Sequence, residues 1–319
     1  MAMRKCVILD DYQGVALNYA DWNAIADRVA VTSLREHIAD EDDLAERLAD
    51  ADIVVLMRER TPFPASLFKR LPRLRLLVTS GMRNSAIDLA AAGDVVVCGT
   101  DSSSAPPAEL TWGLILGLAR QIHIENARMR QNGPWQSTVG VDLHGRRLGI
   151  IGLGKIGTRV AQVGQAFGMH VTAWSPNLTD ERAAAAGVER IASKEELLES
   201  SDFVTIHLVL APTTRRIIGA NELRRMRPSA FLINTSRAAI VDQAALVQAL
   251  EGNWIAGAGL DVFEAEPLPA DHSFRWLPNV LATPHLGYVS EANYQTYFTE
   301  AVEDIEAWLS GSSIRVLGR

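Results

Sequence analysis

A glycine-rich turn between an apolar strand and a helix limits most strongly how this chain can fold. Residues 148–152 read LGIIG, a short apolar run typical of a buried strand, and residues 158–167 follow with helical spacing. Between them, Gly152, Gly154 and Gly157 form the pattern G-x-G-x-x-G. In a strand–turn–helix unit these glycines permit a tight turn, close approach of the backbone to a pyrophosphate, and close packing of helix on strand. The alternative is a turn that only links two packed elements.

Apolar runs alternate with amphipathic stretches along the rest of the chain. We expect strands at 6–9, 29–34, 53–56, 74–80 and 95–98, and in a second series at 148–152, 170–174, 203–208, 230–235, 255–260 and 279–283. Helices are expected between them, as at 41–50. Strands that alternate with helices indicate βαβ units and parallel sheets. The pattern therefore predicts two α/β units.

A Ser/Pro-rich stretch, SSSAPPAE (102–109), separates the two series. Residues 110–131 after it are expected to form one long helix that begins just past the two prolines. Residues 290–311 predict a second long helix. The apolar part of the first helix, WGLILGLA (112–119), suits a subunit interface, and an ordinary core helix explains it equally well.

Composition excludes several classes of protein. At 319 residues with 48% hydrophobic side chains, the chain suits a two-domain globular protein, and it contains no apolar run long enough to span a membrane. The start, MAMRKCVILDD, turns acidic too early for a signal peptide. Cys6 and Cys98 are expected to be buried thiols, and neither a disulfide framework nor a metal site is expected. A net charge of −7 argues against nucleic-acid binding, so a cytoplasmic enzyme is expected.

Three later stretches carry residues suited to chemistry. LINTSRAAIVD (232–242) places Arg237 after a strand, where open α/β sheets bind ligands and where arginine can capture a carboxylate. GLDVFEAEP and ATPHLGY place Glu266 and His285 on loops after two further strands, as an acid and a base for proton transfer. Each residue alone would more often be structural, whereas all three in order indicate a catalytic set.

With these motifs the chain resembles the D-isomer-specific 2-hydroxyacid dehydrogenases over nearly its whole length. The residues that carry the resemblance are NTSRA, DVFEAEP, TPH, HLVLAPTTRRIIG (207–219), MRPSAFLIN (226–234) and PAE (107–109). The resemblance implies an α/β fold in which a Rossmann-type dinucleotide-binding domain is inserted into a flavodoxin-like substrate domain. The expected boundaries are 104–287 for the inserted domain and 1–103 plus 288–319 for the substrate domain.

The resemblance also implies hydride transfer between a nicotinamide cofactor and C2 of a small 2-oxo or D-2-hydroxy acid. Arg237 would hold the substrate carboxylate and the C2 oxygen, His285 would exchange the hydroxyl proton, and Glu266 would orient the imidazole and favour its charged form. The expected cofactor contacts are Gly152, Gly154, Lys155, Ile156, Gly157, Thr235 and Ser236. Asp261 is either a further cofactor contact or a structural residue of its turn.

A loop of the first domain, VTSGMRNSAID (78–88), corresponds to the stretch that binds substrate in this family. Gly81 matches the family pattern, and Met82 follows it. Arg83 stands where a second glycine is common, so its side chain either favours a second acidic group on the substrate or points to solvent. Tyr288 replaces a residue that is often small, and it either narrows the pocket or packs at the hinge between domains.

The residue that usually selects the cofactor is missing. An acid that binds the adenosine ribose is expected about 20 residues after the glycines, and Ser175 stands there, followed by Pro176 and Asn177. Loss of the acid removes the repulsion of a 2′-phosphate, but the nearest arginine, Arg182, lies beyond an expected helix start. We therefore expect NAD or NADP as cofactor, with NADP accepted or even preferred but without strong discrimination.

Two classes of function fit these residues. The first is an NAD(P)-dependent reductase of a small 2-oxo acid such as glyoxylate or hydroxypyruvate, active as a homodimer. The chain ends at its expected crossing helix, which favours such a reductase over serine biosynthesis. The second is a dinucleotide-sensing binding protein, like the corepressors of the same fold, with little turnover. Oxidation of NADH or NADPH on addition of a 2-oxo acid distinguishes them.

Overall fold

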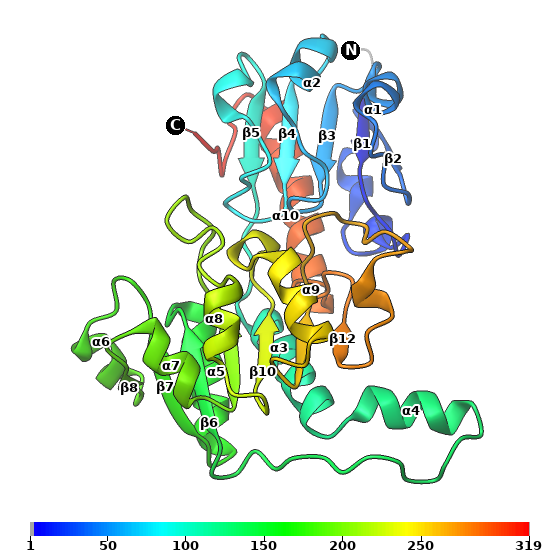
Figure 1. Cartoon of the computed structure of the whole chain (residues 1–319). Helices are drawn as coiled ribbons and strands as arrows, with labels where there is room; N and C mark the ends of the chain where they lie inside the picture. Colours follow the sequence, from blue (N-terminus) through cyan, green and yellow to red (C-terminus); the bar gives the residue numbers. More distant parts are fainter. Residues whose placement is uncertain (1–2, 319) are drawn as a thin grey trace. The chain divides into compact units, whose positions relative to one another are not determined.

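The computed structural model describes residues 3–318, which form two compact units (Figure 1). Residues 3–103 and 290–318 make the first unit, and residues 104–289 make the second, so the second unit is an insertion in the first. Each unit has its own parallel sheet. The predicted α/β fold with an inserted domain is confirmed. Tyr288 and Val289 belong to the inserted unit, slightly beyond the boundary expected from the sequence.

The first unit has a five-stranded sheet in the order β2-β1-β3-β4-β5, which is the flavodoxin order. Its strands are β1 (Arg4–Ile8), β2 (Val29–Ser33), β3 (Ile53–Leu56), β4 (Leu76–Thr79) and β5 (Val96–Gly99). Its helices are α1 (Glu41–Leu48), α2 (Ala65–Arg70) and α10 (Glu291–Leu309). The last helix packs against β4, with Tyr297, Phe298 and Ile305 buried. Cys6 and Cys98 are buried, as predicted.

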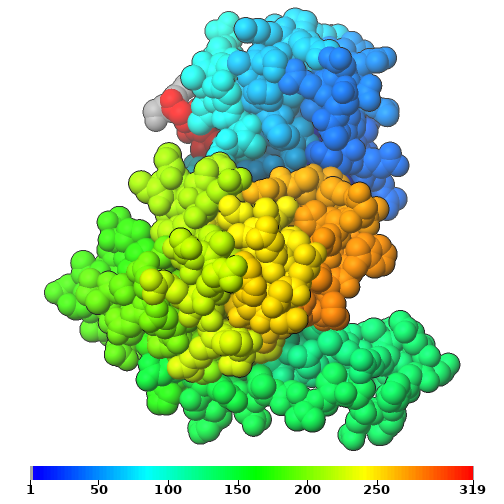
Figure 2. Space-filling model, viewed as in Figure 1, coloured from blue at the N-terminus to red at the C-terminus, as the bar shows by residue number. Residues whose placement is uncertain are grey.

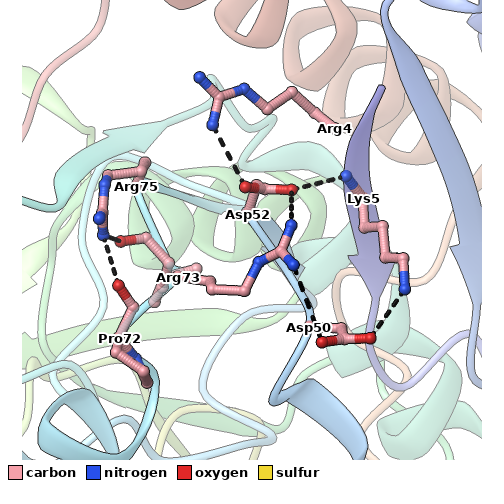
Figure 3. Close-up of polar contacts among 8 residues, drawn as sticks. Arg4, Lys5, Asp50, Asp52, Pro72, Arg73 and Arg75 are labelled. Atoms are coloured by element: carbon pink, nitrogen blue, oxygen red, sulfur yellow. Dashed lines mark hydrogen bonds and ion pairs between the residues drawn. The ribbon is translucent and has the colours of Figure 1, made fainter. Parts of the chain in front are cut away.

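A carboxylate at the start of β3 joins the amino ends of three neighbouring strands. Figure 3 shows Arg4 and Arg73 converging on Asp52, with Nη–Oδ distances of 3.2 and 3.4 Å, while the backbone N–H of Lys5 donates to the same carboxylate at 2.9 Å. The Nζ of Lys5 also binds Asp50 at 2.8 Å. Asp52 is buried and satisfied by these donors, so it stabilises the sheet edge opposite to the carboxyl ends of the strands.

The second unit has a seven-stranded parallel sheet in the order β12-β11-β10-β9-β6-β7-β8. Its strands are β6 (Arg147–Ile151), β7 (His170–Trp174), β8 (Glu189–Arg190), β9 (Phe203–Ile206), β10 (Phe231–Asn234), β11 (Gly257–Leu260) and β12 (Val280–Ala282). The order reverses between β6 and β9. In open α/β sheets ligands bind at this switch point, outside the carboxyl ends of the strands.

The helices of the second unit are α3 (Ala105–Ala119), α4 (Ile122–Arg130), α5 (Lys155–Ala166), α6 (Asp180–Ala185), α7 (Lys194–Ser200), α8 (Ala220–Arg225) and α9 (Gln243–Glu251). The apolar stretch 112–119 is a core helix, because Trp112, Leu114, Ile115 and Leu118 are buried within this unit. None of the described helices, within residues 3–318, has the length and apolarity needed to cross a membrane.

The expectation of one long helix over 110–131 is wrong. The helix α3 includes Pro106 and Pro107 in its first turn, where the missing N–H groups would have no helical partner. It ends at Ala119, and Gln121 has a left-handed backbone (φ 53°) before α4 begins. Because α4 buries no residue, no packing holds it in line with α3. Figure 2 shows the segment of α4 projecting from the rest of its unit.

Candidate active site

The three glycines of the glycine-rich turn differ in their steric surroundings. Gly152 follows β6 with φ 105°, and a Cβ there would lie 2.7 Å from the backbone of His207. A Cβ on Gly157 would lie 2.2 Å from the carbonyl oxygen of Gly152. At Gly154, by contrast, nothing lies within 4 Å of the Cβ position. The outer glycines therefore allow close packing, and the middle one leaves space beside the backbone.

This space lies at the beginning of α5, a helix of 12 residues. Its N-cap residue is Gly154, which has no side chain to accept the first N–H groups. Unpaired N–H groups and the helix dipole favour a phosphate at such a terminus. The residues present thus fit the pyrophosphate of a dinucleotide, which the backbone N–H groups around Gly154, Lys155 and Ile156 would hold.

The loop after β10 is shaped by Asn234. Its side-chain amide accepts from the backbone N–H of Ser236 at 3.0 Å and donates to the carbonyl oxygen of Arg237 at 3.1 Å. The hydroxyl of Ser236 donates to the carbonyl oxygen of Ile206 at 3.0 Å, which joins the loop to β9. Arg237 Nη1 donates to the carbonyl oxygen of Ser236 at 2.8 Å. Asn234 is buried, and it therefore fixes the backbone from which Arg237 projects.

Glu266 and His285 form a close pair. Nδ1 of His285 lies 2.6 Å from Oε2 of Glu266, while Oε1 of Glu266 accepts from the backbone N–H of Phe263 at 2.8 Å. Both side chains are half-buried, with 19% of His285 and 27% of Glu266 exposed. Because a carboxylate occupies Nδ1, this nitrogen carries a hydrogen and Nε2 remains for proton exchange. The pair can therefore take or give one proton at a fixed atom.

Asp261 holds the loop that carries His285. Its Oδ1 accepts from the Thr283 hydroxyl and from the N–H of Leu286, both at 2.7 Å, and its Oδ2 accepts from the N–H of Gly287 at 2.8 Å. The side chain is fully buried, and this burial raises the pKa of Asp261. Its contacts lie on both sides of His285, whose backbone is left-handed at φ 54°. Within its unit, Asp261 therefore fixes the backbone that carries His285.

Tyr288 also contacts the histidine. Its ring is buried and meets the imidazole of His285 edge to face, with centroids 5.3 Å apart. The imidazole is thus bounded by a carboxylate at Nδ1 and by an aromatic ring. Such a contact limits rotation of the side chain.

Four features lie together at the carboxyl ends of the strands of the second sheet: the glycine turn, Arg237, Glu266 and His285. They follow β6, β10, β11 and β12, which are parallel members of that sheet. The loop that holds Ser175, Pro176 and Asn177 follows β7 at the same edge, and it lies beside the glycine turn because Gly152 N–H donates to the carbonyl oxygen of Trp174 at 2.9 Å. Within residues 3–318, no cluster of three or more His, Cys, Asp or Glu side chains could hold a metal ion.

The expected substrate loop lies at the carboxyl end of β4 in the first unit. Gly81 is buried with φ 92°, and a Cβ there would lie 2.0 Å from Nη1 of Arg58. Met82 and Arg83 are exposed. The amide of Asn84 donates to the carbonyl oxygen of Arg58 at 2.6 Å. Contacts with Arg58 therefore shape this loop.

Sequence reasoning did not single out Asn234 and Thr283. Both are polar residues at or just after a strand end, inside motifs that the sequence does identify. Their position at a strand end could have marked them as candidates for the site, but their hydrogen bonds depend on how the loops fold.

The chain is similar to known proteins in sequence and in structure. Residues 112–287 match the family model of the D-isomer specific 2-hydroxyacid dehydrogenase NAD binding domain. A D-3-phosphoglycerate dehydrogenase of Methanocaldococcus jannaschii is 37% identical over 276 residues, covering 85% of this chain and 52% of the relative. A glyoxylate reductase of Korarchaeum cryptofilum is 35% identical over 277 residues, covering 84% of this chain and 82% of the relative. The chain thus spans about half the length of such phosphoglycerate dehydrogenases.

Solved structures give the same result over nearly the whole chain. A phosphoglycerate oxidoreductase of Vibrio cholerae superposes with a TM-score of 0.92 at 36% identity, covering 97% of this chain and 100% of the other. The second unit thus has the Rossmann-like fold of an NAD-binding domain. The chain belongs to the D-isomer-specific 2-hydroxyacid dehydrogenase family, as the sequence predicted.

Proposed function

We propose that this protein catalyses reversible hydride transfer between a nicotinamide cofactor and C2 of a small 2-oxo or D-2-hydroxy acid. The observation that carries the proposal is the contact of 2.6 Å between Glu266 and Nδ1 of His285 at the carboxyl edge of a Rossmann-like sheet. This contact leaves one imidazole nitrogen for the substrate. The nicotinamide ring, when bound, supplies or accepts the hydride.

The residues of the chain bind the substrate and move its proton. Nε2 of His285 gives a proton to the C2 oxygen during reduction and takes it back during oxidation. Glu266 keeps the imidazole oriented and stabilises its charged form while the proton is held. Arg237 binds the substrate carboxylate through its planar guanidinium, and it also polarises the C2 oxygen.

A panel of 2-oxo acids tests this function. Glyoxylate, hydroxypyruvate and pyruvate are assayed with NADH and with NADPH, using the unaltered chain, His285→Ala and Arg237→Ala. We expect turnover with at least one acid and a loss of about 10²-fold or more in each variant. Near-normal turnover in either variant contradicts the roles assigned here. Binding of cofactor without turnover for any acid supports the alternative of a dinucleotide-sensing protein.

We propose glyoxylate or hydroxypyruvate as the substrate. The glyoxylate reductase of K. cryptofilum is similar to this chain over most of both lengths, which supports this choice. The exposed side chain of Arg83 in the substrate loop supports a substrate with a second acidic or polar group. Arg83→Ala therefore separates the two acids, because it should raise KM more for the larger substrate.

We propose that NADPH is accepted as well as NADH. The support is Ser175, which stands at the end of β7 in place of the acid that repels a 2′-phosphate. Comparing kcat/KM for the two cofactors tests this point. A strong preference for NADH contradicts it.

We propose a homodimer in which a second copy covers the α4 arm, defined as residues 122–141. The buried apolar helix α3 does not offer such a surface, whereas Met129, Trp135 and Val139 on the arm are 60%, 85% and 95% exposed. Apolar side chains this exposed on a projecting segment favour a protein partner. Light scattering of the unaltered chain and of Trp135→Glu tests the interface. Equal mass for both proteins contradicts it.

A further inference from the structure

Arg182 reaches back to the glycine-rich turn. Thr179 caps α6 by accepting from the backbone N–H of Arg182 at 3.3 Å, so the helix begins as the sequence predicts. The guanidinium, however, returns toward the site: Nη2 donates to the carbonyl oxygen of Leu153 and Nη1 to that of Asn177, each at 3.4 Å. Arg182 thus spans the gap between the glycine turn and the loop after β7. Arg182 therefore lies beyond the helix start, as expected, but its side chain returns to the turn.

The positive charge of Arg182 is available to an anion. Its two contacts are long and involve neutral oxygens, and such hydrogen bonds are easily exchanged. Among residues 3–318, no carboxylate lies within ion-pair distance of it. Of the two acids that precede it in the chain, Asp180 pairs with Arg190 at 3.3 Å, and hydrogen bonding to its own backbone and to Thr179 lowers the pKa of Glu181. The side chain is also exposed.

The position of the guanidinium indicates which anion it would meet. A dinucleotide whose pyrophosphate lies on the glycine turn places its adenosine ribose beside the end of the second strand. In this chain that strand is β7, and Ser175 stands where an acid would bind the ribose hydroxyls. Leu153 and Asn177, the two residues that Arg182 contacts, lie on either side of this corner. A phosphate on the 2′ oxygen would therefore lie within reach of Arg182.

We propose that Arg182 is the specificity-determining residue that binds the 2′-phosphate of NADP. The inference rests on the proposed function, because it needs the nucleotide to lie on the glycine turn. It deepens that proposal, since the charge that recognises the phosphate comes from α6 rather than from the residues directly after β7. A planar guanidinium suits a phosphate because it offers several donors in one plane.

Two nucleotides that differ only in this phosphate test the proposal. Dissociation constants of adenosine 2′,5′-bisphosphate and adenosine 5′-monophosphate are measured by titration calorimetry on the full chain. The ratio of the two constants isolates the 2′-phosphate from all other contacts. We expect the unaltered chain to prefer the bisphosphate, and Arg182→Gln to reduce this preference by about tenfold, as for loss of one charge-assisted hydrogen bond. Arg182→Lys should retain part of the preference.

Arg225→Gln is the matched control. Arg225 lies on α8, is half-exposed and pairs with Glu199, so its replacement removes the same charge away from the nucleotide corner. This variant should keep the preference of the unaltered chain. Circular dichroism confirms that each variant is folded.

The outcomes separate the two proposals. An equal ratio in Arg182→Gln and the unaltered chain overturns the role of Arg182, even if both nucleotides bind. A ratio that falls equally in Arg182→Gln and Arg225→Gln also overturns it, because the effect is then one of general charge. Failure of the unaltered chain to bind either nucleotide overturns the proposed cofactor site and the role of Arg182 with it.

Discussion

Replacing Asp304 with asparagine should remove a pH dependence from the stability of the first unit. Asp304 lies on α10 with a fully buried side chain, and its Oδ1 accepts from Nε of Arg315 at 3.0 Å. Arg315 is shared with Glu300 and Glu303, so three acids compete for one cation. Burial raises the pKa of Asp304 to about 7, and the two glutamates add to this effect.

The sign of the effect follows from the proton balance. Between pH values of about 4 and 7 the folded chain keeps the Asp304 proton, whereas the unfolded chain has released it. The stability that this group provides is therefore complete below about pH 4 and is lost as the pH rises through 7. The loss is at most about 1.4 kcal/mol per pH unit. Because the partners of Asp304 are partly exposed to water, we expect about 1–2 kcal/mol between pH 5 and pH 8.

Urea titrations at pH 5, 6, 7 and 8, followed by hydrogen exchange of α10 peptides, measure this dependence. The side chain in Asp304→Asn stays neutral at every pH. The free energy of unfolding of this variant, relative to that of the unaltered chain, should therefore increase as the pH rises. Glu303→Gln is the control, because it removes an exposed partner of Arg315 and leaves the buried carboxyl in place. If the unaltered chain and Asp304→Asn lose stability in parallel from pH 5 to pH 8, the reasoning is refuted.

Three further substitutions test the site and the fold. Glu266→Gln should lower kcat by about 10²-fold with little change in KM, because a neutral amide no longer stabilises the charged imidazole of His285; an unchanged kcat in steady-state assays would contradict the pairing. Asp261→Asn should cost the second unit about 1–3 kcal/mol in urea unfolding, since its amide N–H₂ would face the N–H of Gly287; equal stability would show that Asp261 does not hold the loop. Asp52→Ala should destabilise the first unit by about 1–3 kcal/mol. The loss of stability should be smaller in high salt, and a loss that does not depend on salt would argue against the ion pairs.

Most of the fold follows from the alternation of apolar and polar residues. Every apolar run expected to be a strand overlaps a strand in the structure, because a buried parallel strand needs such a run. The short strand β8 was not expected: Glu189 and Arg190 are polar and exposed, and pairing with Thr172 and Ala173 of β7 makes them a strand. Whether such an edge segment forms a strand depends on tertiary contacts rather than on local preference.

The break at Gln121 has a similar cause. Apolar residues continue past Ala119 as Ile122 and Ile124, so the sequence shows no break there, and the direction of α4 depends on what covers it. A polar helix without a buried face carries no signal of its angle to the preceding helix.

The site was predictable in its residue types and less so in its contacts. Arg237, Glu266 and His285 stand in motifs at strand ends, so their common sheet edge could be expected. The sequence left Asp261 open between two roles, because its three hydrogen bonds depend on a left-handed backbone at His285. The contact of Arg182 with the glycine turn was not predicted, because it depends on the direction of α6 after its N-cap.

The insertion of one unit into the other sets an order on folding during synthesis. The second unit is complete in sequence once Val289 has left the ribosome, and domains generally fold as units as they emerge. The first unit must wait, because Tyr297, Phe298 and Ile305 of α10, which its core requires, are made after the inserted unit. The sheet of the first unit therefore stays incompletely covered while the entire inserted unit is synthesised, and α10 covers it only afterwards.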